Sequence, residues 1–388
     1  MVPRAAVPDP VRRHVPHRVR LPLAQLDGIF ITELPAAGGA RLAVKDLFDT
    51  AGVRTTYGSA VFADHVPEVT AAAVGALEAA GWSSVGKTNL HEFAYGVTSQ
   101  NLHYGTVPNP LYPGRTSGGS SGGSAAALAA GLADAALGTD SGGSIRIPAA
   151  CCGVVGLKPT FGLVSTDGLF PLAPSYDHAG PMAREVETCV ALMRVLGGVA
   201  GGSKGSFSVA LAWHERAEPL VRARLEEAGR LLGARPISLP LPEGTTAIFM
   251  REVADVHRDL YAEHGELYGE NIRPKIERCL AVADAEVEAA GAARVAYERE
   301  ALAALEGFDL LLTPTLGFVP PPADVDEIAT RESMIRFTYP FNLLGWPALA
   351  LPCGPAEEGL PASAQLVGRP GADALVLAAG AQLEASLG

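Results

Sequence analysis

Cysteine is scarce in this sequence, and the spacing of the few cysteines excludes two kinds of site. The chain has five cysteines in 388 residues, an odd number, and none of them form a C-x-x-C pair. We therefore expect neither a disulfide framework nor a zinc site. Reduced cysteines that form neither disulfides nor a metal site are typical of a cytoplasmic protein.

Long apolar runs and an excess of positive charge are also missing. No stretch approaches the roughly 20 uninterrupted apolar residues that cross a bilayer. The Arg- and Pro-rich segment 1–27, which we interpret as an arm, lacks the apolar centre of a secretory signal. The formal net charge is −12, which repels phosphate backbones and anionic lipids. These absences favour a cytoplasmic protein that binds neither nucleic acid nor membranes.

The chain does contain a regular alternation of strand and helix patterns. Hydrophobic residues make up 48% of the sequence and charged residues 19%, which indicates a folded core. The expected strands are 41–48, 82–86, 207–213 and 308–315, and the expected helices are 67–80, 124–136, 184–197, 217–233 and most of 248–306. This order predicts an α/β fold. We predict one domain over 1–388, with its core at 40–200 and 307–388 and a variable, mostly helical part at 201–306.

Two short motifs match known signatures in the wrong structural context. Residues 81–88, GWSSVGKT, fit the phosphate-loop pattern. A phosphate loop leaves a strand and enters a helix, whereas here a helix is expected before the motif and a strand after it. Residues 118–122, GGSSG, fit a nucleophile elbow, which needs a preceding strand and a late histidine. The last histidine is His264, so neither motif predicts the function.

Two Gly/Ser loops, at 117–124 and 139–144, are the more informative pattern. A flexible linker is the ordinary interpretation of such runs, but linkers join domains, and both loops lie between apolar segments. Glycine lets a substrate approach the backbone closely and leaves N–H groups available to it. An oxyanion site requires both properties.

The segment around these loops resembles a known family. The run GGSSGGSAAALAAGLADAALGTDSGGSIRIPAACCGVVGLKPT (118–160) closely resembles the signature of the amidase signature family. Further segments agree with it, at 43–59, 86–96, 101–110, 177–184, 311–315, 340–354 and 360–371. The resemblance implies a large mixed, twisted β-sheet covered by α-helices on both faces. It also implies a Ser–cis-Ser–Lys catalytic unit, in which Ser144 is the nucleophile, Ser120 the cis-serine and Lys45 the base.

The same resemblance implies roles for neighbouring residues. The oxyanion hole would consist of the backbone N–H groups of Ser141, Gly142, Gly143 and Ser144. The acyl side of the substrate pocket would be lined by Ala94, Tyr95 and Gly96, together with Ser120. The loop would be supported by the pair Asp140 and Arg146 and by Ser121.

Lysine suits the role of base at position 45. Only five of the 30 basic residues are lysines, and arginine could not give up its proton. A lysine has an ordinary pKa of about 10.4, and a base needs a value of about 7–8, which burial can provide. Lys87 and Lys158 are rival bases, and the alternative relay residues are Ser117, Ser121 and Ser124. His91 and His103 are expected to be structural, because a lysine mechanism leaves them no role.

We therefore expect a stand-alone amidase that forms an acyl-enzyme on Ser144 and needs neither a metal nor an organic cofactor. Its partner would be a small-molecule amide, and a homodimer stays open. One alternative is the glutaminase subunit of a tRNA-dependent amidotransferase. Another is a non-catalytic binding protein on the same fold, which the retained Lys45, Ser120 and Ser144 disfavour. The amide itself is not predicted, and selectivity is expected to lie in 200–306 and 316–338.

Overall fold

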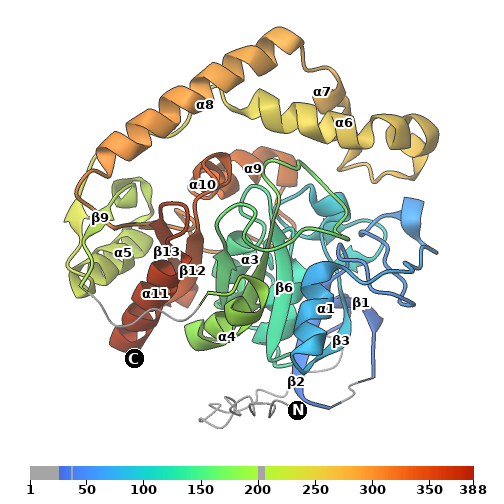
Figure 1. Cartoon of the computed structure of the whole chain (residues 1–388), viewed down its shortest axis with the longest axis horizontal. Coiled ribbons are helices and arrows are strands. Elements are labelled where there is room, and N and C mark those ends of the chain that lie inside the picture. The colour runs from blue at the N-terminus through green and yellow to red at the C-terminus, as the bar shows by residue number, and fades with distance from the viewer. Residues whose placement is uncertain (1–25, 36–37, 200–205) are drawn as a thin grey trace, which may run out of the picture.

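The architecture is a mixed α/β fold, which confirms the predicted class (Figure 1). The computed structural model describes residues 26–35, 38–199 and 206–388. The arm expected at 1–27 therefore lies almost entirely outside the described residues.

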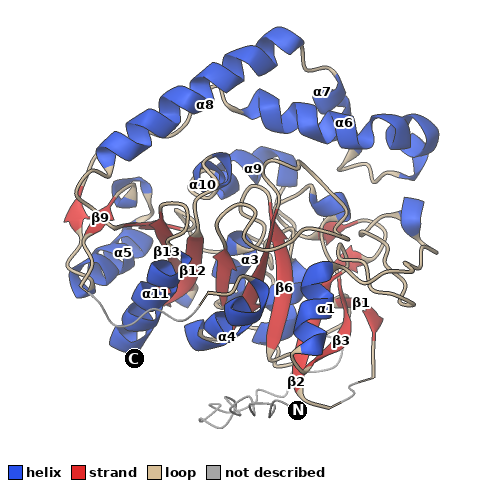
Figure 2. Ribbon diagram, viewed as in Figure 1, coloured by secondary structure: helices blue, strands red, loops and turns tan. Residues whose placement is uncertain are grey.

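The centre of the molecule is a twisted sheet of 11 strands within the described residues (Figure 2). Its strands, in spatial order, are β1 (Phe30–Glu33), β3 (Trp82–Thr88), β2 (Ala40–Lys45), β6 (Ala135–Asp140), β8 (His178–Ala183), β7 (Val155–Lys158), β12 (Ala348–Pro355), β13 (Pro361–Gly368), β11 (Leu310–Pro314), β9 (Val209–Leu211) and β10 (Arg235–Pro236). The sheet contains parallel pairs, such as β2 with β3 and β6, and antiparallel pairs, such as β6 with β8. The sheet is therefore mixed, as the family resemblance implies.

Helices cover both faces of this sheet. One face packs against α1, α4, α5 and α11, and the other against α2 and α3. The helices are α1 (Ala72–Ala79), α2 (Gly122–Ala129), α3 (Arg146–Cys152), α4 (Val186–Leu196), α5 (Pro219–Leu231), α6 (Thr246–His264), α7 (Arg273–Leu280), α8 (Asp284–Ala304), α9 (Glu327–Ile335), α10 (Tyr339–Leu343) and α11 (Asp373–Leu387). Smaller elements are β4 (Gln100–Asn101), β5 (Gly105–Thr106), η2 (Ala60–Phe62), η3 (Glu92–Ala94), η4 (His214–Arg216), η5 (Gly265–Leu267) and η6 (Glu357–Gly359).

The segment that leads into the second Gly/Ser loop is a strand, β6, and not the end of the predicted helix. The helix expected over 124–136 ends at Ala129, and Gly131, with a φ of +70°, makes the turn into β6. Every residue of β6 is buried, because helices cover this part of the sheet on both sides. A strand buried on both faces shows no polar–apolar alternation. The sequence AALGTD therefore gave no strand signal, although it places Asp140 at the end of a central strand.

Residues 248–306 are mostly helical, as expected. Helices α6, α7 and α8 form a separate layer across the top of the molecule, above the loops and α9–α10 (Figure 1). Phe249 of α6 and Ile276 of α7 belong to one buried cluster with Tyr95 and Tyr339 from the main body. This cluster brings α6 and α7 beside the loops that carry the candidate site.

Candidate active site

Lys45 is the last residue of β2 and is fully buried. Its amine Nζ donates to Ser120 Oγ at 2.7 Å and to Thr139 Oγ1 at 2.7 Å. Burial lowers the pKa of Lys45 to about 7, against the opposing effect of the Asp140 and Asp177 carboxylates, which raise it. A large fraction of this amine is therefore neutral near pH 7, which a general base requires.

Ser120 lies in the first Gly/Ser loop, and the Gly119–Ser120 peptide bond is cis. The Ser120 carbonyl accepts hydrogen bonds from His91 N at 3.2 Å and from Ser99 Oγ at 3.3 Å. A Cβ atom at Gly119 would come within 2.8 Å of Ser99 N, so only glycine fits there. The loop serines are buried, whereas a flexible linker would be exposed, so this run is not a linker.

The second loop carries Ser144, which is 8% exposed and lines a cavity. The Ser144 carbonyl accepts from Ser121 N at 3.1 Å, which ties the two loops together. The Ser144 hydroxyl forms no hydrogen bond with any residue that the structure describes, and catalytic hydrogen bonds often tighten only when substrate binds.

The four expected oxyanion donors are not equivalent. The N–H of Gly143 donates to Asp140 Oδ1 at 2.9 Å and is therefore already engaged. Within the described chain, the N–H groups of Ser141, Gly142 and Ser144 have no acceptor. A side chain at Gly143 would collide with Thr338. Gly143 thus shapes the turn, and of the four expected donors the N–H groups of the other three residues are left free among the described residues.

Asp140 and Arg146 form a fully buried ion pair beneath this loop. Arg146 Nε donates to Asp140 Oδ2 at 2.9 Å, and Nη2 donates to Oδ1 at 2.8 Å. Burial alone would raise the pKa of Asp140, but Arg146 holds it below its usual range. Arg146 also donates to Thr338 O, Gln365 Oε1 and Asn342 Oδ1. The pair therefore joins the loop to α10 and β13.

We expect Arg146→Met to lower the free energy of unfolding by about 3–5 kcal/mol, because it leaves the Asp140 carboxylate buried without its partner. Urea denaturation measures this loss. Arg299→Met is the matched control, because Arg299 is exposed on α8, and it should change the stability by less than about 0.5 kcal/mol. Equal stability of the two variants would contradict a structural role for the pair.

Two residues that the sequence analysis did not single out support the site. Thr139 Oγ1 accepts a second hydrogen bond from the Lys45 amine, in addition to the one accepted by Ser120. Asp177 accepts a hydrogen bond from Ser141 Oγ at 2.5 Å and from the backbone N–H groups of Leu172 and Ala173. Burial raises the pKa of Asp177 to about 6. The only sequence signal for Asp177 was its position at the start of the segment 177–184, which resembles the family.

Replacing Asp177 with asparagine should shift the pH dependence of the site. The Asp177 carboxylate raises the pKa of Lys45, so its loss lets that pKa fall from about 7 to a lower value. The amine then stays neutral at lower pH. The acid limb of the labelling rate of Ser144 with a fluorophosphonate should move to lower pH, by up to about one unit. Asp167→Asn, at an exposed position, should leave the limb in place, and a shift of Asp177→Asn to higher pH would refute the coupling.

The rival bases have other partners. Lys87 Nζ donates to Phe48 O and to Thr55 Oγ1, both at 2.6 Å, and lies 3.3 Å from Asp46. Lys158 Nζ contacts Pro159 O and His178 Nε2. In the described part of the chain, Lys45 is the lysine whose amine contacts a candidate serine.

The neighbouring histidines also have structural surroundings. Burial lowers the pKa of His91 to about 3, so its ring is neutral. The ring packs against Gly96, where a Cβ atom would collide with it. His103 Nε2 lies 3.2 Å from Glu92 Oε1.

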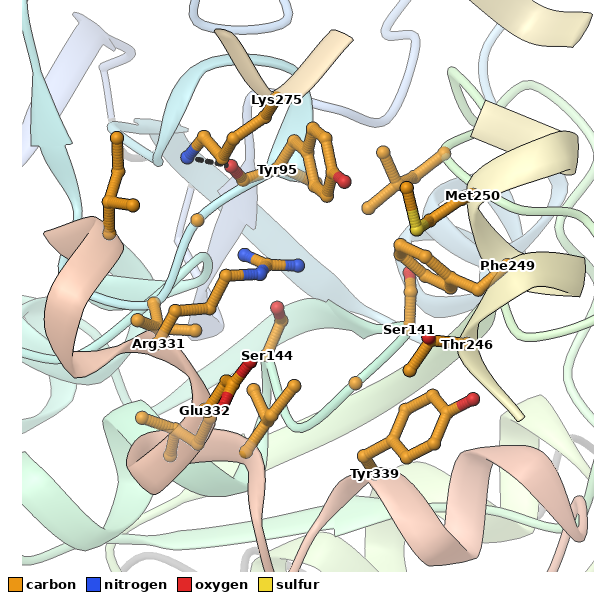
Figure 3. Close-up of a pocket in the computed structure, with 18 of the residues that line it drawn as sticks. Tyr95, Ser141, Ser144, Thr246, Phe249, Met250, Lys275, Arg331, Glu332 and Tyr339 are labelled. Carbon is orange, nitrogen blue, oxygen red and sulfur yellow. Dashed lines mark hydrogen bonds between the residues drawn. The ribbon is translucent and has the colours of Figure 1, made fainter. Parts of the chain in front are cut away.

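The cavity at Ser144 has a volume of about 180 Å³ (Figure 3). The expected Ala94, Tyr95 and Gly96 line it, together with Ser141, Gly142 and Ser144. Ser120, which was expected to touch substrate, is not among the residues that line the cavity. Most of the remaining wall comes from α6, α7 and α9, which include Phe249, Met250, Lys275, Arg331 and Glu332.

A metal site needs several His, Cys, Asp or Glu side chains close together. In residues 26–35, 38–199 and 206–388, no group of three or more His, Cys, Asp or Glu side chains could hold a metal ion. No helix in these same ranges is long and apolar enough to cross a membrane.

Comparison with known proteins identifies the class. The family model described as Amidase matches residues 31–219 and 238–377, so the chain belongs to the amidase family and is a hydrolase of amide carbon–nitrogen bonds. A curated relative from Thermus thermophilus, one of the subunits of glutamyl-tRNA(Gln) amidotransferase, is 37% identical over 90% of this chain and 85% of its own length.

Solved structures agree with this assignment. One described as an amidase is 39% identical, has a TM-score of 0.82 and covers 90% of this chain and 85% of its own. The corresponding glutamyl-tRNA(Gln) amidotransferase subunit from Thermotoga maritima is 29% identical, with a TM-score of 0.77 over 93% of this chain and 90% of its own.

These relatives contradict the partners expected from the sequence. We expected a small-molecule amide and no nucleic acid, but the relatives are named as one subunit of an enzyme whose name includes a tRNA. The net charge of −12 is a sum over the whole chain. Such a sum describes long-range repulsion and does not exclude a local contact or one made through another subunit.

Proposed function

We propose that the chain cleaves an amide through an acyl-enzyme on Ser144 and supplies the released ammonia as one subunit of an amidotransferase. The observation that carries the chemistry is the buried Lys45 amine, 2.7 Å from Ser120 Oγ, with a pKa lowered to about 7 by burial. The names of the curated relatives favour the subunit role.

The first half of the proposed reaction uses these same groups. Neutral Lys45 accepts the Ser120 hydroxyl proton while Ser120 takes the proton of Ser144, and Ser144 Oγ attacks the amide carbonyl carbon. The N–H groups of Ser141, Gly142 and Ser144 bind the resulting oxyanion. Each such donor stabilises the transition state by about 2.7–4 kcal/mol.

The second half restores the enzyme. Lys45 returns the proton through Ser120 to the amide nitrogen, the carbon–nitrogen bond breaks, and ammonia leaves. Water then gives a proton to the same relay and attacks the Ser144 ester, which releases the carboxylate and restores the serine hydroxyl. Every proton removed from Ser144 or water is thus passed to a leaving group, and no other reactant is required.

A stand-alone amidase is the second candidate, because a solved structure described simply as an amidase is 39% identical to this chain. Ammonia release by the purified chain, measured on glutamine and on simple aliphatic amides, separates the two. A chain that works within a complex should turn over well below about 1 s⁻¹ when alone, whereas independent enzymes typically reach 1–10³ s⁻¹. Turnover in that higher range by the monomeric chain would overturn the subunit role and support the stand-alone enzyme.

A further inference from the structure

The cavity at Ser144 carries positive charge inside an acidic protein. Lys275, Arg278 and Arg331 line it, whereas Glu332 is the one acidic residue that the described part of the chain adds to its lining. The chain as a whole has a net charge of −12. A cavity whose sign opposes that of its surroundings concentrates anions at that point.

Lys275 does not supply this charge to a ligand, because Glu327 neutralises it. Lys275 Nζ lies 2.9 Å from Glu327 Oε2 and donates to Tyr95 O at 2.7 Å. Burial lowers the pKa of Lys275 to about 8. The other oxygen of Glu327, Oε1, accepts from Val97 N at 3.2 Å. This ion pair is buried and serves as part of the wall.

Arg331 differs from Lys275 because its guanidinium keeps its donors. The nearest carboxylate oxygen, Glu327 Oε1, lies 3.6 Å from Nη1, and Arg331 forms no side-chain hydrogen bond with the residues that the structure describes. Its Cζ atom lies 4.7 Å from the centre of the Tyr95 ring. Figure 3 shows the guanidinium extending from α9 into the middle of the cavity, between Tyr95 and Ser144. A guanidinium has five N–H donors and no acceptor, so its natural ligand is an anion.

We propose that Arg331 binds a carboxylate on the acyl part of the substrate, so that the substrate is an amide that also carries a carboxylate. The inference rests on the proposed function. If the leaving group is ammonia, the substrate is a primary amide, and any further group that the cavity recognises must belong to the acyl part. A planar carboxylate matches the guanidinium in a two-point hydrogen bond, and the Tyr95 ring beneath fixes the plane of the guanidinium. Arg331 is thus a specificity residue, and it does not take part in proton transfer.

Protection of Ser144 from a fluorophosphonate by glutarate, a dicarboxylate, tests this proposal. Glutarate should slow labelling of the wild-type chain, and Arg331→Met should weaken that protection roughly 10- to 100-fold, the range expected for hydrogen bonds to a charged group. Methionine still packs on Tyr95. Arg331→Lys should recover part of the protection. Arg336→Met is the control, because Arg336 is exposed at the end of the same helix. Glutarate should protect Ser144 of this variant as strongly as it protects Ser144 of the wild type.

Turnover of two matched amides supplies the second readout. Glutaramate and pentanamide differ by a carboxylate in place of a methyl group. Arg331→Met should raise KM for glutaramate at least tenfold, with kcat little changed, and should change pentanamide turnover by less than threefold. Equal losses on both amides, or equal protection by glutarate in wild type and variant, would overturn the proposal. Absence of any Ser144 labelling in the wild type would instead reject the proposed function.

Discussion

Replacing Ser144 with alanine should lower kcat about a millionfold, as the loss of the nucleophile does in other serine hydrolases. The oxyanion donors and the cavity remain, but without the Ser144 hydroxyl no acyl-enzyme can form. Amide turnover and covalent labelling by a fluorophosphonate measure the loss, and labelling should disappear completely.

The matched control is Ser165→Ala, because Ser165 is exposed and lies outside both Gly/Ser loops. It should label at the wild-type rate. Ser121→Ala is a second, more demanding control, since Ser121 is buried, donates its N–H to Ser144 O and donates its hydroxyl to Thr139 O. It should retain labelling at a reduced rate. Full labelling of Ser144→Ala would show that another residue is the nucleophile.

Replacing Lys45 with methionine should have the second largest effect, a loss of about 10²–10⁴ in kcat, which is typical for a general base. Methionine fills a similar apolar space but cannot accept the proton from Ser120. Lys45→Arg should be equally inactive, because arginine keeps the positive charge but cannot release its proton. Single-turnover labelling of Ser144 measures both variants.

The arginine variant separates two roles for the amine. A lysine that acted only through its positive charge, by holding the loops or attracting substrate, would be replaced in part by arginine. Activity of Lys45→Arg within tenfold of the wild type would therefore contradict the base role. Thermal unfolding of each variant confirms that the compared proteins are folded.

The candidate site residues that the sequence could name are those that lie within short, distinctive sequence motifs. Lys45, Ser120 and Ser144 could be named because each lies in a distinctive local segment, and the structure brings the Lys45 amine to Ser120. The phosphate-loop match at 81–88 was set aside because of the order of elements, and β3 does follow α1 there. Local order was enough to exclude the phosphate loop, and the catalytic roles of Lys45, Ser120 and Ser144 stay a prediction.

The parts that the sequence did not predict depend on long-range contacts. The engaged N–H of Gly143 depends on the position of the Asp140 side chain within a buried network. Selectivity was expected in 200–306 and 316–338, but no local pattern singled out Lys275 or Arg331, which reach the cavity from helices far from the signature segment. Strand β6 was missed for a different reason, because burial on both faces removed its alternation.

The central claim is that the amine at position 45 is neutral near pH 7 and removes the proton from the nucleophile through Ser120. The most direct test is the rate at which a neutral fluorophosphonate labels the wild-type chain as a function of pH. The rate should rise with a single midpoint near pH 7, as the pKa of Lys45 requires, and level off above it, and Lys45→Met should lack this limb. A rate that keeps rising to a midpoint near 10.5, the ordinary pKa of lysine, or a limb that persists in Lys45→Met, would contradict the claim.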